Sequence, residues 1–314
     1  MKTESRVFRG ISVISLVIFC AVMVMPAQGV QDLLVGSYDS EAILRYDGET
    51  GAFIGVFTYA DPTGGLAYGP DGNLYVGEYD KVQRYNGTTG AFIDTFASYS
   101  GMENAGGIVF GPDGNLYVIC SAEDYLELGG VMRFNGLTGD FIETFASGGG
   151  LNRPQDLAFG PDGNLYVSSL LTDSVLRYDG STGAFIDTFA SGGGLDGPFG
   201  LAFGPDNNLY VSSGMTDSVL RYDGSTGAFI DTFASGSGLD LPFGLEFGPD
   251  GNLYVSSNVT DRVLRYNGTT GAFIDEFASG GGLDQPHYLV FMPEPGTLIL
   301  VGLGGLLLLR KRRS

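Results

Sequence analysis

Residues 160–167 read Gly-Pro-Asp-Gly-Asn-Leu-Tyr-Val, and this octapeptide decides the fold because it recurs along the chain. Three identical copies, and a fourth with Asn207 in place of the second glycine, occupy residues 69–76, 111–118, 248–255 and 204–211. An Arg-Tyr/Phe-Asp/Asn-Gly tetrapeptide occurs six times, at residues 45–48, 84–87, 133–136, 177–180, 221–224 and 265–268. Equivalent phenylalanines recur every 44 residues at positions 159, 203, 247 and 291. A period of ~40–50 residues with several short strands is typical of β-propeller blades.

Each unit contains four candidate strands, called A to D from the centre of the disc outward. In the fourth copy they cover residues 199–203, 208–213, 218–222 and 228–233, which are rich in aromatic and β-branched residues. Pro205 and Asp206 favour a turn between the first two strands, and residues 223–227 supply a glycine-containing hairpin turn.

The order of the strands is permuted at the two ends of the repeat region. The first candidate is a strand B at residues 33–36, and the last is a strand A at residues 287–291. We therefore predict an all-β, six-bladed propeller of four-stranded antiparallel blades over residues 30–292. The C-terminal strand would complete the first blade and close the ring, so that no unfinished blade edge is left open. Terminal hydrophobic helices are expected outside this fold.

Residues 1–29 have the organisation of a secretory signal peptide. Lys2, Arg6 and Arg9 form a basic start, residues 11–25 are apolar, and small residues precede an expected cut after Gly29.

Residues 293–314 combine three features in order. Pro293, Glu294 and Pro295 come first, an apolar run follows at 298–309, and the chain ends in a basic cluster of Arg310, Lys311, Arg312 and Arg313. The run is short for a membrane span, which needs ~20 residues, and basic residues favour the cytoplasmic side. The arrangement resembles the PEP-CTERM sorting signal of exported bacterial proteins. That resemblance implies an exosortase-type processing protease and an extracellular polymer layer. The alternative is a C-terminal anchor that is never cleaved.

The repeat resembles NHL-type propeller repeats, through its Asp-Gly-Asn-Leu-Tyr-Val block and its Arg-Tyr/Phe strand. The resemblance covers the whole of residues 30–292 and implies the fold strongly. It also extends to gluconolactonase-like and streptogramin-lyase-like propellers, so it implies activity only weakly.

The charge balance narrows the class of partner. The chain has a net charge of −20, and residues 30–292 alone carry nine basic and 34 acidic residues. Such acidity excludes nucleic acid and anionic lipid as partners of the propeller, whereas divalent cations and cationic polymers are compatible. Cys120 is the only cysteine beyond the signal peptide, so no intrachain disulfide is expected.

In antiparallel blades, the A–B and C–D turns share one face of the disc, here called the turn face. The B–C turns and D–A crossovers share the opposite, crossover face. The crossover face carries the variable loops, including a B–C connection between Val118 and Arg133 that is five residues longer than its counterpart between Val167 and Arg177. Variable loops on a rigid scaffold favour a recognition surface there. The candidate binding residues are Tyr125, Glu127, Asp156, Phe243, His287 and Tyr288.

Two further groups could hold a divalent cation, calcium or similar. Repeated turn aspartates such as Asp71 and Asp162 offer oxygen ligands, although aspartate is also what such turns favour. Gluconolactonase-like propellers hold an axial metal, and here that resemblance points to Asp156 and to Glu246, which replaces Ala or Val of the other A strands. His287 is the only histidine, whereas streptogramin-lyase-like propellers use more than one.

These patterns favour an exported binding or scaffold module of the cell surface or extracellular matrix, with no cofactor. Its expected partners are the processing protease, an exopolysaccharide or surface protein, and the membrane through the C-terminal helix before processing. The alternative function is a metal-dependent, lactonase-like hydrolase. A cluster of two or three carboxylates and an Asn converging at one mouth of the channel would favour the enzyme, and a channel lined by Gly, Phe and Leu would favour the scaffold.

Overall fold

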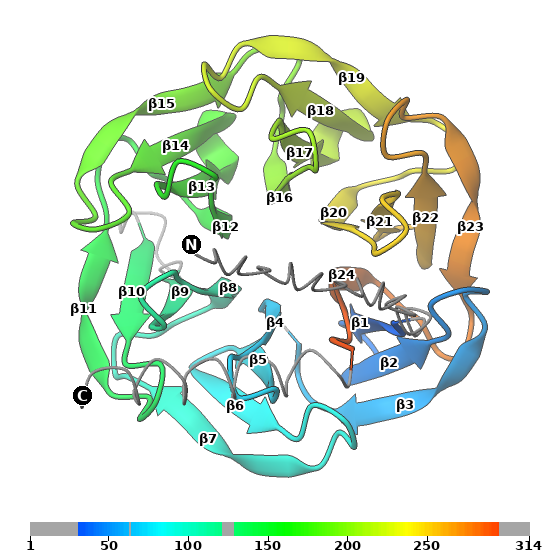
Figure 1. The fold of residues 1–314 in the computed structure, drawn as a ribbon, viewed down its shortest axis with the longest axis horizontal. Coiled ribbons are helices and arrows are strands. Elements are labelled where there is room, and N and C mark those ends of the chain that lie inside the picture. Colours follow the sequence, from blue (N-terminus) through cyan, green and yellow to red (C-terminus); the bar gives the residue numbers. More distant parts are fainter. Residues whose placement is uncertain (1–30, 63, 121–128, 295–314) are drawn as a thin grey trace, which may run out of the picture.

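The computed structural model describes residues 31–62, 64–120 and 129–294, in which 24 strands form six four-stranded antiparallel sheets around a central axis (Figure 1). The sheets are the blades of a β-propeller, as predicted. The expected signal peptide and most of the sorting segment lie outside the described residues. In the described part of the chain, no helix is long and apolar enough to cross a membrane.

The four strands of each blade occupy equivalent positions, with blade 1 taking its A strand from the C-terminal end. The innermost A strands are β24 (Pro286–Phe291), β4 (Leu66–Tyr68), β8 (Ala105–Phe110), β12 (Pro154–Phe159), β16 (Pro198–Phe203) and β20 (Pro242–Phe247). The B strands are β1 (Leu33–Ser37), β5 (Leu74–Glu78), β9 (Leu116–Cys120), β13 (Leu165–Ser169), β17 (Leu209–Ser213) and β21 (Leu253–Ser257). The C strands are β2 (Ala42–Tyr46), β6 (Lys81–Tyr85), β10 (Gly130–Phe134), β14 (Ser174–Tyr178), β18 (Ser218–Tyr222) and β22 (Arg262–Tyr266). The outer D strands are β3 (Phe53–Tyr59), β7 (Phe92–Ser98), β11 (Phe141–Ala146), β15 (Phe185–Ser191), β19 (Phe229–Ser235) and β23 (Phe273–Ser279). Short 3-10 turns, η1 (Leu170–Thr172) and η2 (Gly214–Thr216), join B to C in blades 4 and 5.

The ring is closed by pairing between the two ends of the repeat region. Strand β24 lies antiparallel beside β1, with Leu33 opposite Phe291 and Val35 opposite Leu289. All three strands β1, β2 and β3 of blade 1 precede the other blades in sequence, and only its A strand follows them. The predicted closure of blade 1 is therefore confirmed.

The hydrophobic core lies between neighbouring blades. Between blades 4 and 5, the Tyr166 ring contacts Phe189 and Phe203 edge-on, with ring centroids 4.8 and 4.9 Å apart. Arg177 lies over Phe189 and pairs with Asp187 at 2.6 Å, which covers the outer end of the cluster. Because five of the six blades repeat the tyrosine, the repeat sequence specifies equivalent interfaces around the ring.

The repeated turn aspartates are engaged within the fold. The Asp162 carboxylate accepts hydrogen bonds from the Asn164 backbone and side-chain amides and from the Tyr166 hydroxyl, at 2.7–3.0 Å. In the described part of the chain, no group of three or more His, Cys, Asp and Glu residues is arranged to hold a metal. These carboxylates thus have a structural role that accounts for their repetition.

Truncation of Leu289 on β24 tests whether the closing strand is packed as firmly as a strand of a continuous blade. Leu289→Ala should lower the free energy of unfolding by about 2–5 kcal/mol, because a buried leucine leaves a cavity. The matched control is Leu245→Ala on β20, where the leucine has the same 6% exposure. Urea unfolding should give similar losses for both variants. A much smaller loss for Leu289→Ala would show that the closing strand is weakly held.

Candidate binding site in the axial channel

The A strands have a common six-residue pattern whose third position faces the axis. Four blades have glycine there: Gly65, Gly107, Gly200 and Gly244. A Cβ on Gly200 would lie 2.5 Å from the carbonyl oxygen of Phe243, and one on Gly244 would lie 2.6 Å from that of His287. The backbone of the next blade occupies the space of a side chain, so most blades accept only glycine.

Two blades depart from this pattern with Asp156 on β12 and Tyr288 on β24. They belong to blades 4 and 1, which lie opposite each other across the axis (Figure 1). The fifth position also faces the axis and is Ala or Val in five blades, but Glu246 on β20 of blade 6. Three polar side chains therefore enter the channel, and the other described residues of its lining are small or apolar except for Tyr68.

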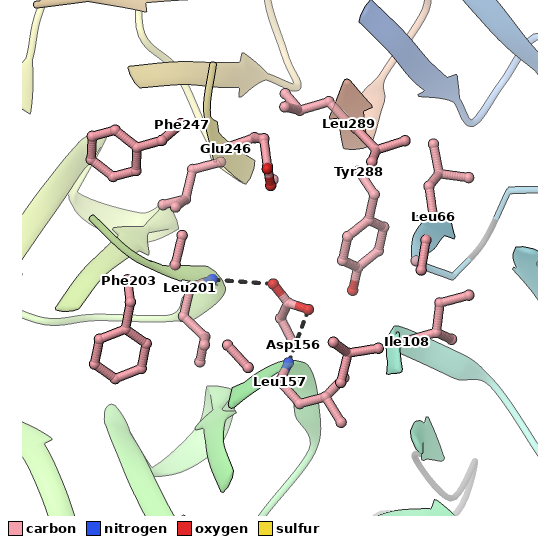
Figure 2. A pocket seen from close by; sticks show the side chains of 18 of the residues that line it. Leu66, Ile108, Asp156, Leu157, Leu201, Phe203, Glu246, Phe247, Tyr288 and Leu289 are labelled. Atoms are coloured by element: carbon pink, nitrogen blue, oxygen red, sulfur yellow. Dashed lines mark hydrogen bonds between the residues drawn. The ribbon is translucent and has the colours of Figure 1, made fainter. Parts of the chain in front are cut away.

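These departures surround a cavity of about 590 Å³. Among the described residues, its wall consists of the third to the sixth positions of the A strands and includes none from the first two positions. The cavity thus occupies the half of the channel nearer the turn face. Figure 2 shows Asp156, Glu246 and Tyr288 directed into it, among leucine, isoleucine and phenylalanine side chains.

Tyr288 bridges the channel. Its side chain extends from β24 in blade 1, and its hydroxyl donates a hydrogen bond of 2.7 Å to the Gln155 carbonyl in blade 4. The residue is 7% exposed, and burial raises the pKa of its phenol well above the usual value. The phenol is therefore neutral and forms the floor of the cavity on the crossover side.

Asp156 is held in place by two backbone amides. One carboxylate oxygen accepts from Leu157 N–H at 2.9 Å and the other from Leu201 N–H, in the next blade, at 3.1 Å. Burial nevertheless raises the pKa of Asp156 to about 7, and the two amide hydrogen bonds oppose that rise. Asp156 is consequently poised to change charge near neutral pH.

Glu246 has no hydrogen bond or ion pair with any described residue. Its side chain is half-buried and faces the same cavity as Asp156. Burial raises the pKa of Glu246 to about 7, with a further contribution from the negative charge of Asp156. The cavity thus contains an acidic group without a hydrogen-bonding or ionic partner in the described part of the chain.

A row of aromatic rings lies on the crossover side of the cavity. Phe199, Phe243, His287 and Tyr38 stack successively, with centroid distances of 4.5, 4.2 and 4.8 Å. Burial lowers the pKa of His287 to about 4, so its imidazole is neutral at pH 7. Phe199, Phe243 and His287 are the second residues of their A strands, and Tyr38 directly follows β1. None of these four residues belongs to the cavity lining.

Comparison with known proteins extends only to the fold. No protein-family model matches the chain, and no curated protein matches it in sequence. Among solved structures, a protein of unknown function from Bacteroides caccae is 15% identical, with a TM-score of 0.66, over 85% of this chain and 100% of that one.

A chain of a nidogen/laminin complex is 17% identical, with a TM-score of 0.67, over 84% of this chain and 98% of that one. The virginiamycin B lyase from Staphylococcus aureus is 17% identical, with a TM-score of 0.55, over 74% of this chain and 78% of that one. These likenesses establish the propeller fold alone.

The structure brings together three of the residues singled out from sequence: Asp156, Glu246 and Tyr288. It places Phe243 and His287 in the aromatic row, and Tyr125 and Glu127 lie outside the described residues. Cys120 is buried in the core, and burial raises the pKa of its thiol to about 12. The channel-facing role of Asp156 and Tyr288 had a sequence signal, because both replace the glycine of the other A strands.

The raised pKa of Glu246 predicts a pH-dependent cost to stability. A carboxyl whose pKa is about 7 when folded, against an ordinary 4.5, keeps its proton in the folded state over that interval, so stability falls as pH rises through it. Glu246→Gln should raise the free energy of unfolding by about 1–3 kcal/mol at pH 8 and by much less at pH 4.

Urea unfolding of both proteins at the two pH values measures this difference. The exposed Glu49→Gln variant is the control and should show little effect at either pH. A gain for Glu246→Gln that is the same at pH 4 and pH 8 would contradict the assignment of an enclosed, titrating carboxyl.

Proposed function

We propose that this protein is an exported surface module that binds a small ligand group in its axial cavity. The observation that carries the proposal is the convergence of Asp156, Glu246 and Tyr288 in an apolar cavity, at positions where the other blades have Gly, Ala or Val. Small-molecule sites typically combine apolar walls with a few converging polar groups. The nearly identical blades around this cavity suit a rigid scaffold.

The proposal of export rests on the two ends of the sequence. Residues 1–29 have the pattern of a signal peptide, and residues 293–314 resemble a PEP-CTERM sorting signal. We propose that the propeller, with its NHL-like repeats, is released or anchored outside the cell through this tail. A chain of a nidogen/laminin complex shows that a propeller of this shape occurs in a protein–protein assembly.

Binding is favoured over catalysis by the state of the reactive groups. Cys120 is buried with a raised thiol pKa, and His287 lies in the aromatic row outside the cavity. The Tyr288 proton is engaged with a backbone carbonyl. The cavity therefore presents acids without an activated nucleophile among the described residues.

A metal-dependent hydrolase is the second candidate, because Asp156 and Glu246 enter one cavity. Calcium takes 6–8 oxygen ligands, whereas the described side chains there supply two carboxylates and one phenol. The donor set thus does not fit a metal held mainly by the protein, and we derive no reaction step through one.

Narrowing the channel tests the proposed binding site. The full chain should be screened by thermal shift against amines, carboxylates, sugars, lactones and divalent cations, with hydrolysis products measured in parallel. Ala158→Val combined with Ala202→Val should abolish the change in melting temperature caused by a ligand that enters the channel, because the added methyl groups narrow it between blades 4 and 5. Two other blades already have valine at this position. Ligand binding that survives the double variant would contradict the axial site, and turnover would contradict a pure binding role.

The route of export predicts defined chain ends. Mass spectrometry of the protein from the surface fraction of a bacterium with a PEP-CTERM system should show a start at Val30 and loss of the basic end, Arg310 to Arg313. Glu294→Ala is the matched variant and should leave the tail uncleaved and the protein in the membrane. A full-length cytoplasmic product would refute export, and an intact tail with a mature start would indicate a permanent anchor.

A further inference from the structure

We infer that the axial cavity recognises a primary ammonium group carried on a small apolar body. This inference rests on the proposed function, because it assigns a ligand class to that same cavity. It follows from the hydrogen-bond acceptors of Asp156, Glu246 and Tyr288 that remain unused by the described part of the protein.

At a pH where both carboxyls are ionised, the three polar groups offer acceptors and no donor to the cavity. Tyr288 uses its proton on the Gln155 carbonyl, so only the lone pairs of its oxygen remain. Each oxygen of Asp156 accepts one backbone amide and retains further acceptor capacity. Glu246 has no hydrogen-bonding or ionic partner among the residues that the structure describes, and its ionised carboxylate is acceptor-only. A ligand that satisfies all three groups must therefore be a donor.

An ammonium group matches this set in number and in charge. It carries three N–H donors and no acceptor, and the site offers acceptors from three different blades. None of the described residues that line the cavity is Lys, Arg or His, so no described side chain of the lining compensates the negative charge of the two carboxylates. Charge-assisted hydrogen bonds of this kind are stronger than neutral ones, especially away from water.

The remaining wall suits an alkyl substituent. Leu66, Ile108, Leu201 and Leu289 belong to the lining, from four different blades. A volume of about 590 Å³ accommodates a small ligand body beside the polar groups. Burial of apolar surface against these side chains adds affinity that a hydrated inorganic cation cannot gain.

The site should also respond to pH. The titratable side chains of the lining are Asp156, Glu246 and Tyr288, together with Tyr68 on β4, whose hydroxyl donates to the Gly87 carbonyl. Both phenols remain neutral because burial raises their pKa. The carboxyls have a pKa of about 7 and are protonated below it, so ammonium binding should weaken as pH falls from 8 to 5.5.

Calorimetric titration of the full chain with n-butylamine at pH 8 tests the inference, with n-butanol, butyrate and calcium chloride as alternative probes. Butylammonium should bind with one site, at least tenfold more tightly than butanol. Binding should weaken at least tenfold at pH 5.5, and at least tenfold in Glu246→Gln and in Asp156→Asn. The exposed Glu49→Gln variant should bind as the wild type does. A single cooperative thermal transition for each variant at pH 8 and at pH 5.5 would establish that the variants are folded.

The outcomes separate this inference from the function on which it rests. Butanol that binds as tightly as butylammonium would overturn the ammonium assignment and leave the axial site standing. The same holds for a neutral or anionic ligand that binds the wild type but not the Ala158→Val/Ala202→Val variant. Displacement of butylamine by one calcium ion, lost in Glu246→Gln, would overturn it in favour of the metal site. Failure of every probe to bind the wild-type channel would overturn both.

Discussion

The close approach of six A strands around one axis is the constraint on which the rest of this structure depends. At the third position of these strands, the backbone of the neighbouring blade occupies the space that a Cβ would need, as at Gly200 and Gly244. Glycine is therefore the ordinary residue there, and the small residues two positions later keep the channel open on the turn side. Asp156 and Tyr288 stand at this same position in opposite blades, where Asp156 bonds the next blade's amide and Tyr288 crosses to the far wall. Two of the three polar groups of the site thus replace the glycine that the other blades have at this position.

The fold could be predicted from the sequence because each blade repeats the same strand and turn residues. The period, the turn residues and the permuted strand order predict six blades and closure by residues 287–291, and β24 beside β1 confirms this. The site was only partly accessible to such reasoning. Glu246 can be recognised in the sequence because the other A strands have Ala or Val at its position. Asp156 can be recognised because four other A strands have glycine at its position. The path of the Tyr288 side chain depends on packing across the axis, which no local pattern encodes. The stacking of Phe243 on His287, which puts both outside the cavity, is likewise a tertiary effect.

The carboxyl groups of the channel are costly in the absence of a partner. An isolated carboxylate in an apolar setting loses hydration that a single protein hydrogen bond does not replace. The repeat shows that Ala and Val serve at the position of Glu246, and that glycine serves at the position of Asp156. A protein that keeps acids at both positions gives up stability there, which is the usual relation between a functional site and its scaffold. The turn aspartates do not indicate a functional site in the same way, because their carboxylate oxygens are already hydrogen-bonded within the turns.

The central claim is that Asp156 and Glu246 are enclosed, uncompensated acids of one ligand site. The most direct measurement is carboxyl-carbon NMR of the full chain as a function of pH, with Asp156→Asn and Glu246→Gln used to assign the two signals. The account predicts that both groups titrate with a pKa of about 7, and that removal of either acid lowers the pKa of the other. Ordinary pKa values near ~4 for both groups, unaffected by either substitution, would show that the channel is fully hydrated and would contradict the account.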